Sequence, residues 1–179
     1  GKFAVMFLDL DRFKAINDTF GHEAGDTLLK EMASRFSGSV RASDVVARLG
    51  GDEFVVLVQE AGDVERVNTV ARKVLSAALK PVLIAGQECR VTASVGICMF
   101  PQDAQDEQTL MKNADTAMYR AKAQGKNYVQ FYSAEVDLLS LERMALESSL
   151  RQALLRGEFS LHYQAKLDLK TGAISGVEA

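Results

Sequence analysis

The chain has 179 residues, of which 47% are hydrophobic and 25% charged, and its net charge is −3 with a pI near 5.5. This composition is typical of a globular protein with a sizeable core. The acidic balance argues against binding to nucleic acid or to a membrane surface. No apolar run reaches the roughly 20 residues that span a bilayer, and no signal peptide is visible.

The cysteine and histidine content limits the compartment and the metal chemistry. Cys89 and Cys98 lack the CxxC spacing, which favours reduced thiols and a cytoplasmic location. With only His22 and His162, any metal is expected to be a hard ion with oxygen ligands, magnesium or manganese before zinc. The first residue is not Met and the last lies in mid-pattern, so we expect a piece of a longer protein, which missing segments could tether to a membrane.

The first predicted element is a strand, because residues 3–8 are continuously apolar as in a strand that is covered on both faces. Asp9 ends this run and is expected at the sheet edge. Asp11 is expected to cap a short helix, a second helix is predicted over 27–36, and a polar loop over 17–26 separates the two.

A hairpin is predicted next, between the apolar runs 45–47 and 55–58. Its tip reads Arg48-Leu49-Gly50-Gly51-Asp52-Glu53-Phe54. Gly50 and Gly51 allow a tight turn and leave no side chain in the way of a ligand. Two adjacent carboxylates repel each other, which favours a bound cation or a catalytic task at Asp52 and Glu53. An ordinary solvated turn is the alternative.

The remaining elements complete an α/β (α+β) fold. Apolar spacing predicts helices over 64–78 and 109–124, and strands over 82–84, 89–100 and 128–132. This order matches a split βαββαβ antiparallel sheet with helices packed on one face. In that topology the end of one strand lies beside the start of its antiparallel neighbour, so Asp9 is expected to meet Asp52 and Glu53.

Carboxylates on adjacent strand ends can bind divalent ions, which points to phosphoryl or nucleotidyl transfer. Lys122 and Lys126 are one helical turn apart and could neutralise phosphates, although a solvated helix face is the alternative. Asn17 with Asp26 could pair with the edge of guanine, although both are also common capping and turn residues.

Several separated segments resemble the GGDEF family of diguanylate cyclases, over residues 1–132. They read Phe7-Leu8-Asp9-Leu10-Asp11-Arg12-Phe13-Lys14, Asn17-Asp18-Thr19-Phe20-Gly21-His22, Gly25-Asp26, Gly50-Gly51-Asp52-Glu53-Phe54 and Ala121-Lys122-Ala123-Gln124-Gly125-Lys126-Asn127. The resemblance implies a palm-like, nucleotidyl-cyclase-like fold. It also implies an enzyme that condenses two GTP molecules into cyclic di-GMP and two pyrophosphates.

The resemblance further implies a set of site residues. Metal ligands would be Asp9, the Leu10 carbonyl and Asp52, with Mg²⁺ or Mn²⁺ as the cofactor. Asp52 or Glu53 would help to activate the ribose hydroxyl. The guanine and ribose would be surrounded by Asn17, His22 and Asp26, with Gly50 and Gly51 beside the substrate, and the phosphates would meet Lys14, Lys122 and Lys126.

Three further expectations follow from the resemblance. The product has two equivalent phosphodiester bonds whereas the chain has one set of these residues, so catalysis requires a homodimer. Position 126 is often Arg in the family, and Lys keeps the charge without the bidentate fork. The segment Arg41-Ala42-Ser43-Asp44 stands at the offset of the family's RxxD product-inhibition site, although a surface ion pair is the alternative.

Residues 133–179 resemble a linker helix and the opening of an EAL phosphodiesterase domain. Apolar residues suggest the helix, namely Leu138, Leu141, Met144, Leu146, Leu150, Leu154 and Leu155. The segments 158–165 and 176–179 carry the EAL likeness, with Ala165 where Pro is usual. Glu178 would be a metal ligand in a complete EAL domain. A helix and hairpin without that ancestry is the alternative.

Three functions compete at this point. The first is an active cyclase within a tandem GGDEF–EAL signalling protein. The second is a regulatory module that binds GTP or cyclic di-GMP and controls the adjoining phosphodiesterase. A purely structural interaction domain is the third, and it leaves the convergent acids unexplained.

Overall fold

The computed structural model describes residues 1–135, 146, 149–150, 152–153 and 156–178. The chain divides into two compact units, Gly1–Ser133 and Ala134–Ala179, and each is described by itself.

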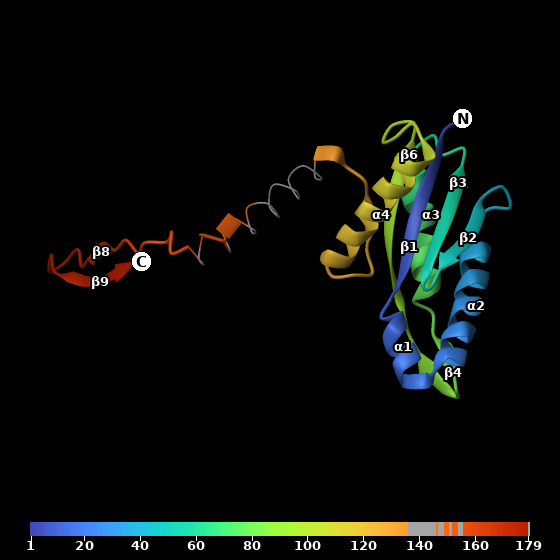
Figure 1. The fold of residues 1–179 in the computed structure, drawn as a ribbon, viewed down its shortest axis with the longest axis horizontal. Helices are drawn as coiled ribbons and strands as arrows, with labels where there is room; N and C mark the ends of the chain where they lie inside the picture. Colours follow the sequence, from blue (N-terminus) through green and yellow to red (C-terminus); the bar gives the residue numbers. More distant parts are fainter. Residues whose placement is uncertain (136–145, 147–148, 151, 154–155, 179) are drawn as a thin grey trace. The chain divides into compact units, whose positions relative to one another are not determined.

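A five-stranded sheet forms the centre of the first unit (Figure 1). Its strands stand in the order β2-β3-β1-β6-β7. Their bounds are β1 (Phe3–Asp11), β2 (Val45–Gly50), β3 (Glu53–Gln59), β6 (Thr92–Phe100) and β7 (Val129–Phe131). β1 pairs antiparallel with both β3 and β6, and β7 runs parallel to β6. This mostly antiparallel sheet with packed helices confirms the predicted α/β fold class.

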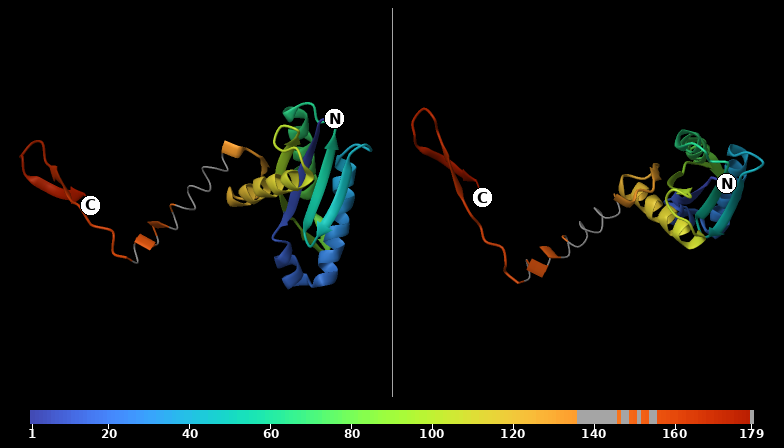
Figure 2. Two further views of the ribbon diagram at one scale, coloured as in Figure 1. Left: turned by 45° about the horizontal axis from the view of Figure 1, so that its top comes forward. Right: turned by 90° about the horizontal axis from the view of Figure 1, so that it is seen from above.

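The helices cover both faces of the sheet (Figure 2). On one face, α2 (His22–Ser39) and α3 (Val64–Ala78) share a core with Met6 and Leu8 of β1. On the other face, α4 (Glu107–Ala123) packs over Val5 and Phe7. The expectation of helices on a single face was therefore wrong for α4. The cause is visible in β1, which is apolar on both faces and needs cover on both.

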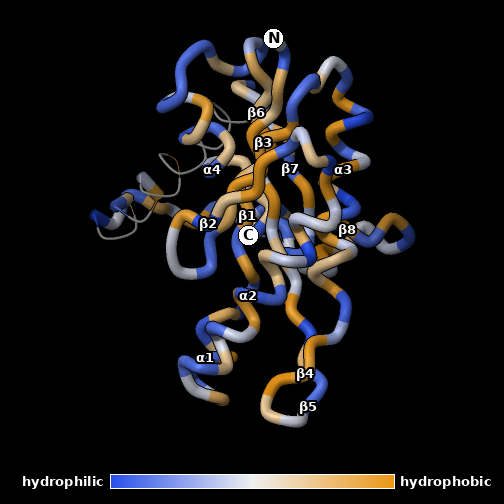
Figure 3. The backbone as a smooth tube through the Cα atoms, turned by 90° about the vertical axis from the view of Figure 1, so that its right-hand side faces the viewer, coloured by the Kyte–Doolittle hydropathy of each residue, from blue (hydrophilic) through white to orange (hydrophobic). Residues whose placement is uncertain are grey.

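Gly96 of β6 allows α4 to lie close to the sheet. A Cβ at this position would collide with main-chain atoms of Ala114 and Met118. The hydropathy colouring of Figure 3 shows the apolar strands between more polar helices. Close packing of α4 brings its last turn, which contains Lys122, to the end of β1.

Two helices replace the polar loop that was predicted over 17–26. α1 (Phe13–Phe20) follows β1, and α2 begins at His22 after Gly21, whose φ is 85°. Asp18, His22 and Asp26 are exposed, whereas the polar Asn17 is half-buried, and α1 has no fully buried residue. The segment therefore lacks the apolar face by which a helix is predicted. Asp11 does not cap α1, because the N-cap position is Arg12 and no side chain caps it.

The other predicted elements agree with the structure, with shifted ends. α3 has the predicted bounds, and Asp63 caps it by accepting from the Glu65 N–H at 3.0 Å. α4 begins earlier than expected because Asp106 caps it through the Thr109 N–H at 2.9 Å. The strand expected over 89–100 is divided, since β5 (Gln87–Cys89) pairs with β4 (Val82–Ile84) in a separate hairpin.

The second unit contains an antiparallel hairpin of β8 (Gln164–Leu167) and β9 (Ile174–Glu178). Much of the predicted linker helix lies outside the described residues, including Leu138, Leu141, Met144, Leu154 and Leu155. Within the described ranges, no helix combines the length and the apolar character that crossing a membrane requires.

Candidate functional site

Acidic residues from β1 and from the β2–β3 turn meet at one end of the sheet. Asp9 stands opposite Glu53 in the register of β1 and β3. The Leu10 N–H donates to the carbonyl oxygen of Asp52 at 3.2 Å, which fixes the turn beside β1. Asp9 is buried, whereas Asp52 and Glu53 are half-buried and reach solvent. The structure thus brings together the acids that the topology placed at this end.

The tip of the β2–β3 hairpin is anchored in the core by Phe54 and has open space around Gly50 and Gly51. Phe54 is fully buried and packs edge-on against Phe36 of α2, with ring centroids 5.3 Å apart. Gly51 has a φ of 51°, and its carbonyl accepts from the Arg48 Nε at 3.0 Å. A Cβ at Gly50 or Gly51 would meet nothing within 4 Å. The tip therefore leaves room for a ligand on this side of the acids.

Lys122 in the last turn of α4 forms an ion pair with Asp9. Its Nζ lies 2.7 Å from the Asp9 Oδ2. Burial raises the pKa of Asp9 above its ordinary value of 3.8, the hydrogen bond from Lys122 lowers it, and the charge of Asp52 raises it again. Burial outweighs the hydrogen bond from Lys122, so the pKa of Asp9 is raised overall and its ionised form is disfavoured.

The oxygen atoms at this end match a hard divalent cation. Asp9 and Asp52 could supply carboxylates. Leu10, which follows Asp9 and is hydrogen-bonded to Asp52, could supply its main-chain carbonyl. Oxygen-only donors of this kind suit Mg²⁺ or Mn²⁺. Within the described residues there is no group of three or more Asp, Glu, His or Cys side chains that could hold a metal, so a site here depends on the carbonyl and on ligand oxygens.

Asn17 and Gly25 are in contact at the corner between α1 and α2. A Cβ on Gly25 would overlap the Asn17 Oδ1. That oxygen is buried and has no hydrogen-bond partner in the part of the chain that the structure describes. Asp26 follows Gly25 and is exposed, as is His22 at the start of α2. The two residues that the sequence predicts to pair with guanine, Asn17 and Asp26, thus lie on two adjoining helices, α1 and α2.

The three candidate phosphate-binding lysines come from different elements. Lys14 lies in the first turn of α1 and is exposed. Lys122 is half-buried against Asp9. Lys126 is exposed in the loop after α4, with a φ of 66°. Among these three described lysines, Lys122 forms an ion pair with a candidate metal ligand, Asp9.

Asp11 is the residue that sequence reasoning placed wrongly. It is 3% exposed, and its carboxylate accepts from Thr92 Oγ1 at 2.6 Å, Ser94 Oγ at 2.8 Å and the Asn127 N–H at 3.2 Å. The segment Asp9-Leu10-Asp11 does contain a signal, since alternate residues of a strand share a face. Asp11 therefore lies on the same face of β1 as Asp9, and it does not cap α1.

The Arg41–Asp44 segment forms a turn before β2. Both carboxylate oxygens of Asp44 accept main-chain bonds, from the Arg41 N–H and the Gln59 N–H, each at 3.0 Å. The side chain of Arg41 is exposed. Asp44 thus shapes the turn that presents Arg41, and the two side chains do not form the surface ion pair that was the alternative.

Two curated relatives from Pseudomonas aeruginosa match almost the whole chain. "Bifunctional diguanylate cyclase/cyclic di-GMP phosphodiesterase MucR" is 47% identical over 178 residues, which are 99% of this chain and 26% of that protein. "Cyclic di-GMP phosphodiesterase NbdA" is 41% identical over 176 residues, which are 98% of this chain and 22% of that protein. The chain thus spans about a quarter of the length of these relatives.

Solved structures resemble the first unit in fold. The GGDEF domain of YfiN from Pseudomonas aeruginosa has a TM-score of 0.72 and 38% identity, covering 74% of this chain and 83% of that one. The GGDEF domain of DgcB from Caulobacter crescentus, in complex with c-di-GMP, has a TM-score of 0.67 and 26% identity, covering 73% and 77%. Residues 1–128 match the family described as "Diguanylate cyclase, GGDEF domain". The chain therefore belongs to the GGDEF domain family of diguanylate cyclases.

Proposed function

We propose that residues 1–132 form a diguanylate cyclase domain that condenses two GTP molecules into cyclic di-GMP and two pyrophosphates. The observation that carries this proposal is the meeting of Asp9, Asp52 and Glu53 at one sheet end, with Lys122 at 2.7 Å from Asp9. Such a pairing of acids with a cation suits a site that holds both a metal ion and a phosphate.

In this proposal Asp9, the Leu10 carbonyl and Asp52 bind Mg²⁺ or Mn²⁺. The bound ion would neutralise the triphosphate and lower the pKa of the attacking hydroxyl. Asp52 or Glu53 takes the proton of the ribose 3′-hydroxyl, whose oxygen attacks the α-phosphate of the second GTP while pyrophosphate leaves. A second, identical step closes the ring.

The remaining residues bind and orient the nucleotide. Lys14, Lys122 and Lys126 neutralise the phosphates. Asn17, His22 and Asp26 contact the guanine and the ribose, and the unpartnered Oδ1 of Asn17 is an acceptor for the amino and imino groups of guanine. Because one chain provides one set of these groups, two copies face each other across a twofold axis during catalysis.

Product inhibition is proposed for the turn before β2. An exposed Arg41 can bind the O6/N7 edge of guanine in cyclic di-GMP in bidentate fashion. Asp44 holds the main chain of this turn and presents Arg41 to the product.

For residues 133–179 we propose the linker and opening of an EAL domain in a tandem signalling protein. The β8–β9 hairpin places Gln164 opposite Glu178 and Ala165 opposite Val177, which joins the two segments that carry the EAL likeness. The whole protein would act in the cytoplasm.

A regulatory module is the second candidate, and the phosphodiesterase name of NbdA favours it. Here the first unit binds GTP or cyclic di-GMP without turnover and controls a neighbouring phosphodiesterase. Binding needs no twofold partner, whereas condensation does.

Incubation with GTP and Mg²⁺, followed by chromatography of the products, separates the two candidates. The cyclase proposal expects cyclic di-GMP from the protein and at least an approximately 100-fold loss in Asp52→Asn. Glu65→Gln, in α3 beyond the far end of β3, is the control and should keep full activity. Tight GTP binding without any product would favour the regulatory module and contradict the cyclase.

A further inference from the structure

The loop after α4 has an unfavourable main-chain conformation that needs outside support. Gly125, Lys126 and Asn127 have successive φ values of 114°, 66° and 49°. Left-handed φ is uncommon for residues other than glycine, so Lys126 and Asn127 keep it only where the surroundings hold them.

Hydrogen bonds hold this loop on three sides. On the helix side, the Lys126 N–H donates to the Ala121 carbonyl at 3.1 Å. On the strand side, the Val95 N–H donates to the Tyr128 carbonyl at 2.9 Å. The third link is the bond from the Asn127 N–H to Asp11, which lies 116 residues earlier in the chain. The main chain on both sides of Lys126 is therefore held by hydrogen bonds.

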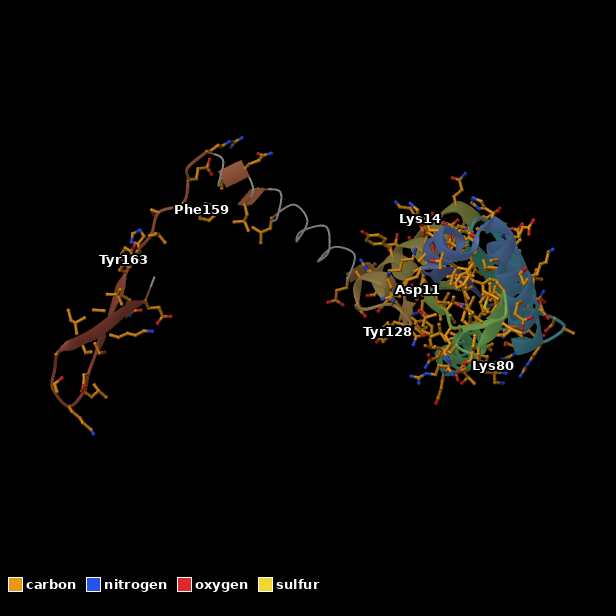
Figure 4. The ribbon with its side chains drawn as sticks, turned by 90° about the horizontal axis from the view of Figure 1, so that it is seen from below. Asp11, Lys14, Lys80, Tyr128, Phe159 and Tyr163 are labelled. Carbon is orange, nitrogen blue, oxygen red and sulfur yellow. The ribbon has the colours of Figure 1, made fainter. Side chains whose placement is uncertain are left out.

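Asp11 is itself held rigidly. Thr92 and Ser94 of β6 donate to its two oxygens, and the residue is almost fully buried. Its carboxylate thus joins the end of β1, the start of β6 and the loop of Lys126. In Figure 4 Asp11 is labelled with Lys14 of α1 and with Tyr128, which follows the loop.

We propose that Asp11 is a positioning residue, which fixes Lys126 where it meets the phosphates of the substrate. Asp9 and Asp11, on the same face of β1, then have different tasks. Asp9 faces Lys122 and Asp52, whereas Asp11 orders the phosphate-binding loop through the Asn127 N–H. This inference rests on the proposed function, because it assigns phosphate binding to Lys126.

A double-mutant cycle tests the positioning role. Binding of 3′-deoxy-GTP with Mg²⁺, which cannot form the new bond, is measured by calorimetry for the wild type, Asp11→Ala, Lys126→Gln and the double variant. Lys126→Gln should weaken binding about tenfold in the wild type and at most about twofold once Asp11 is Ala. An equal loss in both backgrounds would overturn the role, because a residue that only stabilises the fold gives additive effects.

Asp103→Ala is the matched control. Like Asp11, Asp103 supports a loop by accepting a main-chain hydrogen bond, from the Met99 N–H at 2.7 Å. Its loop joins β6 to α4 and lies at the opposite end of β6 from Thr92 and Ser94. The effect of Lys126→Gln should stay near tenfold in this background, and a loss of that effect would count against the role of Asp11. Asp11→Ser, whose side chain is too short to reach the Asn127 N–H, replaces Asp11→Ala if the alanine variant does not fold.

Hydrogen exchange on the wild type provides a test without substitutions. The Asn127 amide should exchange at least about 100-fold more slowly than an open loop, and unprotected exchange would overturn the link to Asp11. The two proposals fail differently. A wild type that binds no 3′-deoxy-GTP overturns the proposed function and this role together, whereas binding with an additive cycle overturns this role alone.

Discussion

The Oδ1 of Asn17 in α1 lies in the space that a Cβ on Gly25 in α2 would occupy. The absence of a side chain at Gly25 therefore lets the Asn17 amide lie against α2, where its oxygen is buried without a partner among the described residues. A buried acceptor of this kind is costly unless a ligand satisfies it, which fits the proposed contact with guanine.

We expect Gly25→Ala to raise the KM for GTP at least about tenfold, because the added methyl displaces Asn17 from the nucleotide. Gly38→Ala in the same helix is the matched control, since a Cβ there meets nothing within 4 Å. That control should leave KM unchanged and stabilise the fold by up to about 1 kcal/mol. Steady-state kinetics and thermal unfolding measure both effects, and equal KM values for the two variants would refute the role of Asn17.

Removal of Arg41 should relieve product inhibition. We expect Arg41→Ala to raise the inhibition constant of cyclic di-GMP at least about tenfold, since the bidentate guanidinium contact is lost. Arg90→Ala, which removes an exposed arginine paired with Glu88, should leave inhibition unchanged. Progress curves with added cyclic di-GMP measure the constants, and unaltered inhibition in Arg41→Ala would remove Arg41 from the inhibitory site.

Arg35 should contribute more to stability than other surface arginines. Its guanidinium donates to the carbonyls of Ala77 in the last turn of α3 and of Lys80 and Pro81 after it, and it pairs with Glu31. We expect Arg35→Ala to lower the free energy of unfolding by about 2–3 kcal/mol, because three carbonyls lose a charged donor. Arg66→Ala removes one such bond, to Glu60, and should cost less than about 1 kcal/mol. Urea unfolding gives both values, and similar losses would contradict this account.

The pH dependence of stability should change in Asp9→Asn. Burial raises the pKa of Asp9 in the folded state above 3.8, so the folded protein binds the proton more tightly than the unfolded chain. Ionised Asp9 therefore costs stability once the pH rises through this raised pKa. Without metal, Asp9→Asn should melt a few degrees higher than the wild type at pH 7, and the gap should close as the pH falls below the raised pKa. A gap that is constant with pH, measured by thermal unfolding, would contradict the assignment.

The meeting of the acids could be predicted from the sequence because it depends on strand order alone. An apolar run that ends in Asp9 and a Gly-Gly turn before Asp52 define an antiparallel pair of strands. The register of this pair places Asp9 opposite Glu53. The bounds of α3, which agree with the helix predicted over 64–78, are equally local. Features of this kind need only neighbouring residues or the order of elements.

The contacts of Asp11 could not be predicted, because its partners Thr92, Ser94 and Asn127 lie 81 to 116 residues away. Locally an Asp before a helix favours a cap, and this tertiary network overrides that preference. The extension of α1 and α2 through residues 17–26 was missed for a similar reason. α1 has no fully buried residue, and the buried residues of α2 before 27 are only Ala24 and Gly25, so no apolar pattern marks this segment.

Magnesium-dependent binding of 3′-deoxy-GTP is the most direct measure of the claim that Asp9 and Asp52 form a metal and phosphate site. By calorimetry, we predict that the wild type binds the nucleotide with Mg²⁺ and that Asp9→Asn or Asp52→Asn weakens binding at least about tenfold, as does removal of Mg²⁺. Equal affinity of the wild type with and without Mg²⁺, or unchanged affinity in both variants, would contradict it.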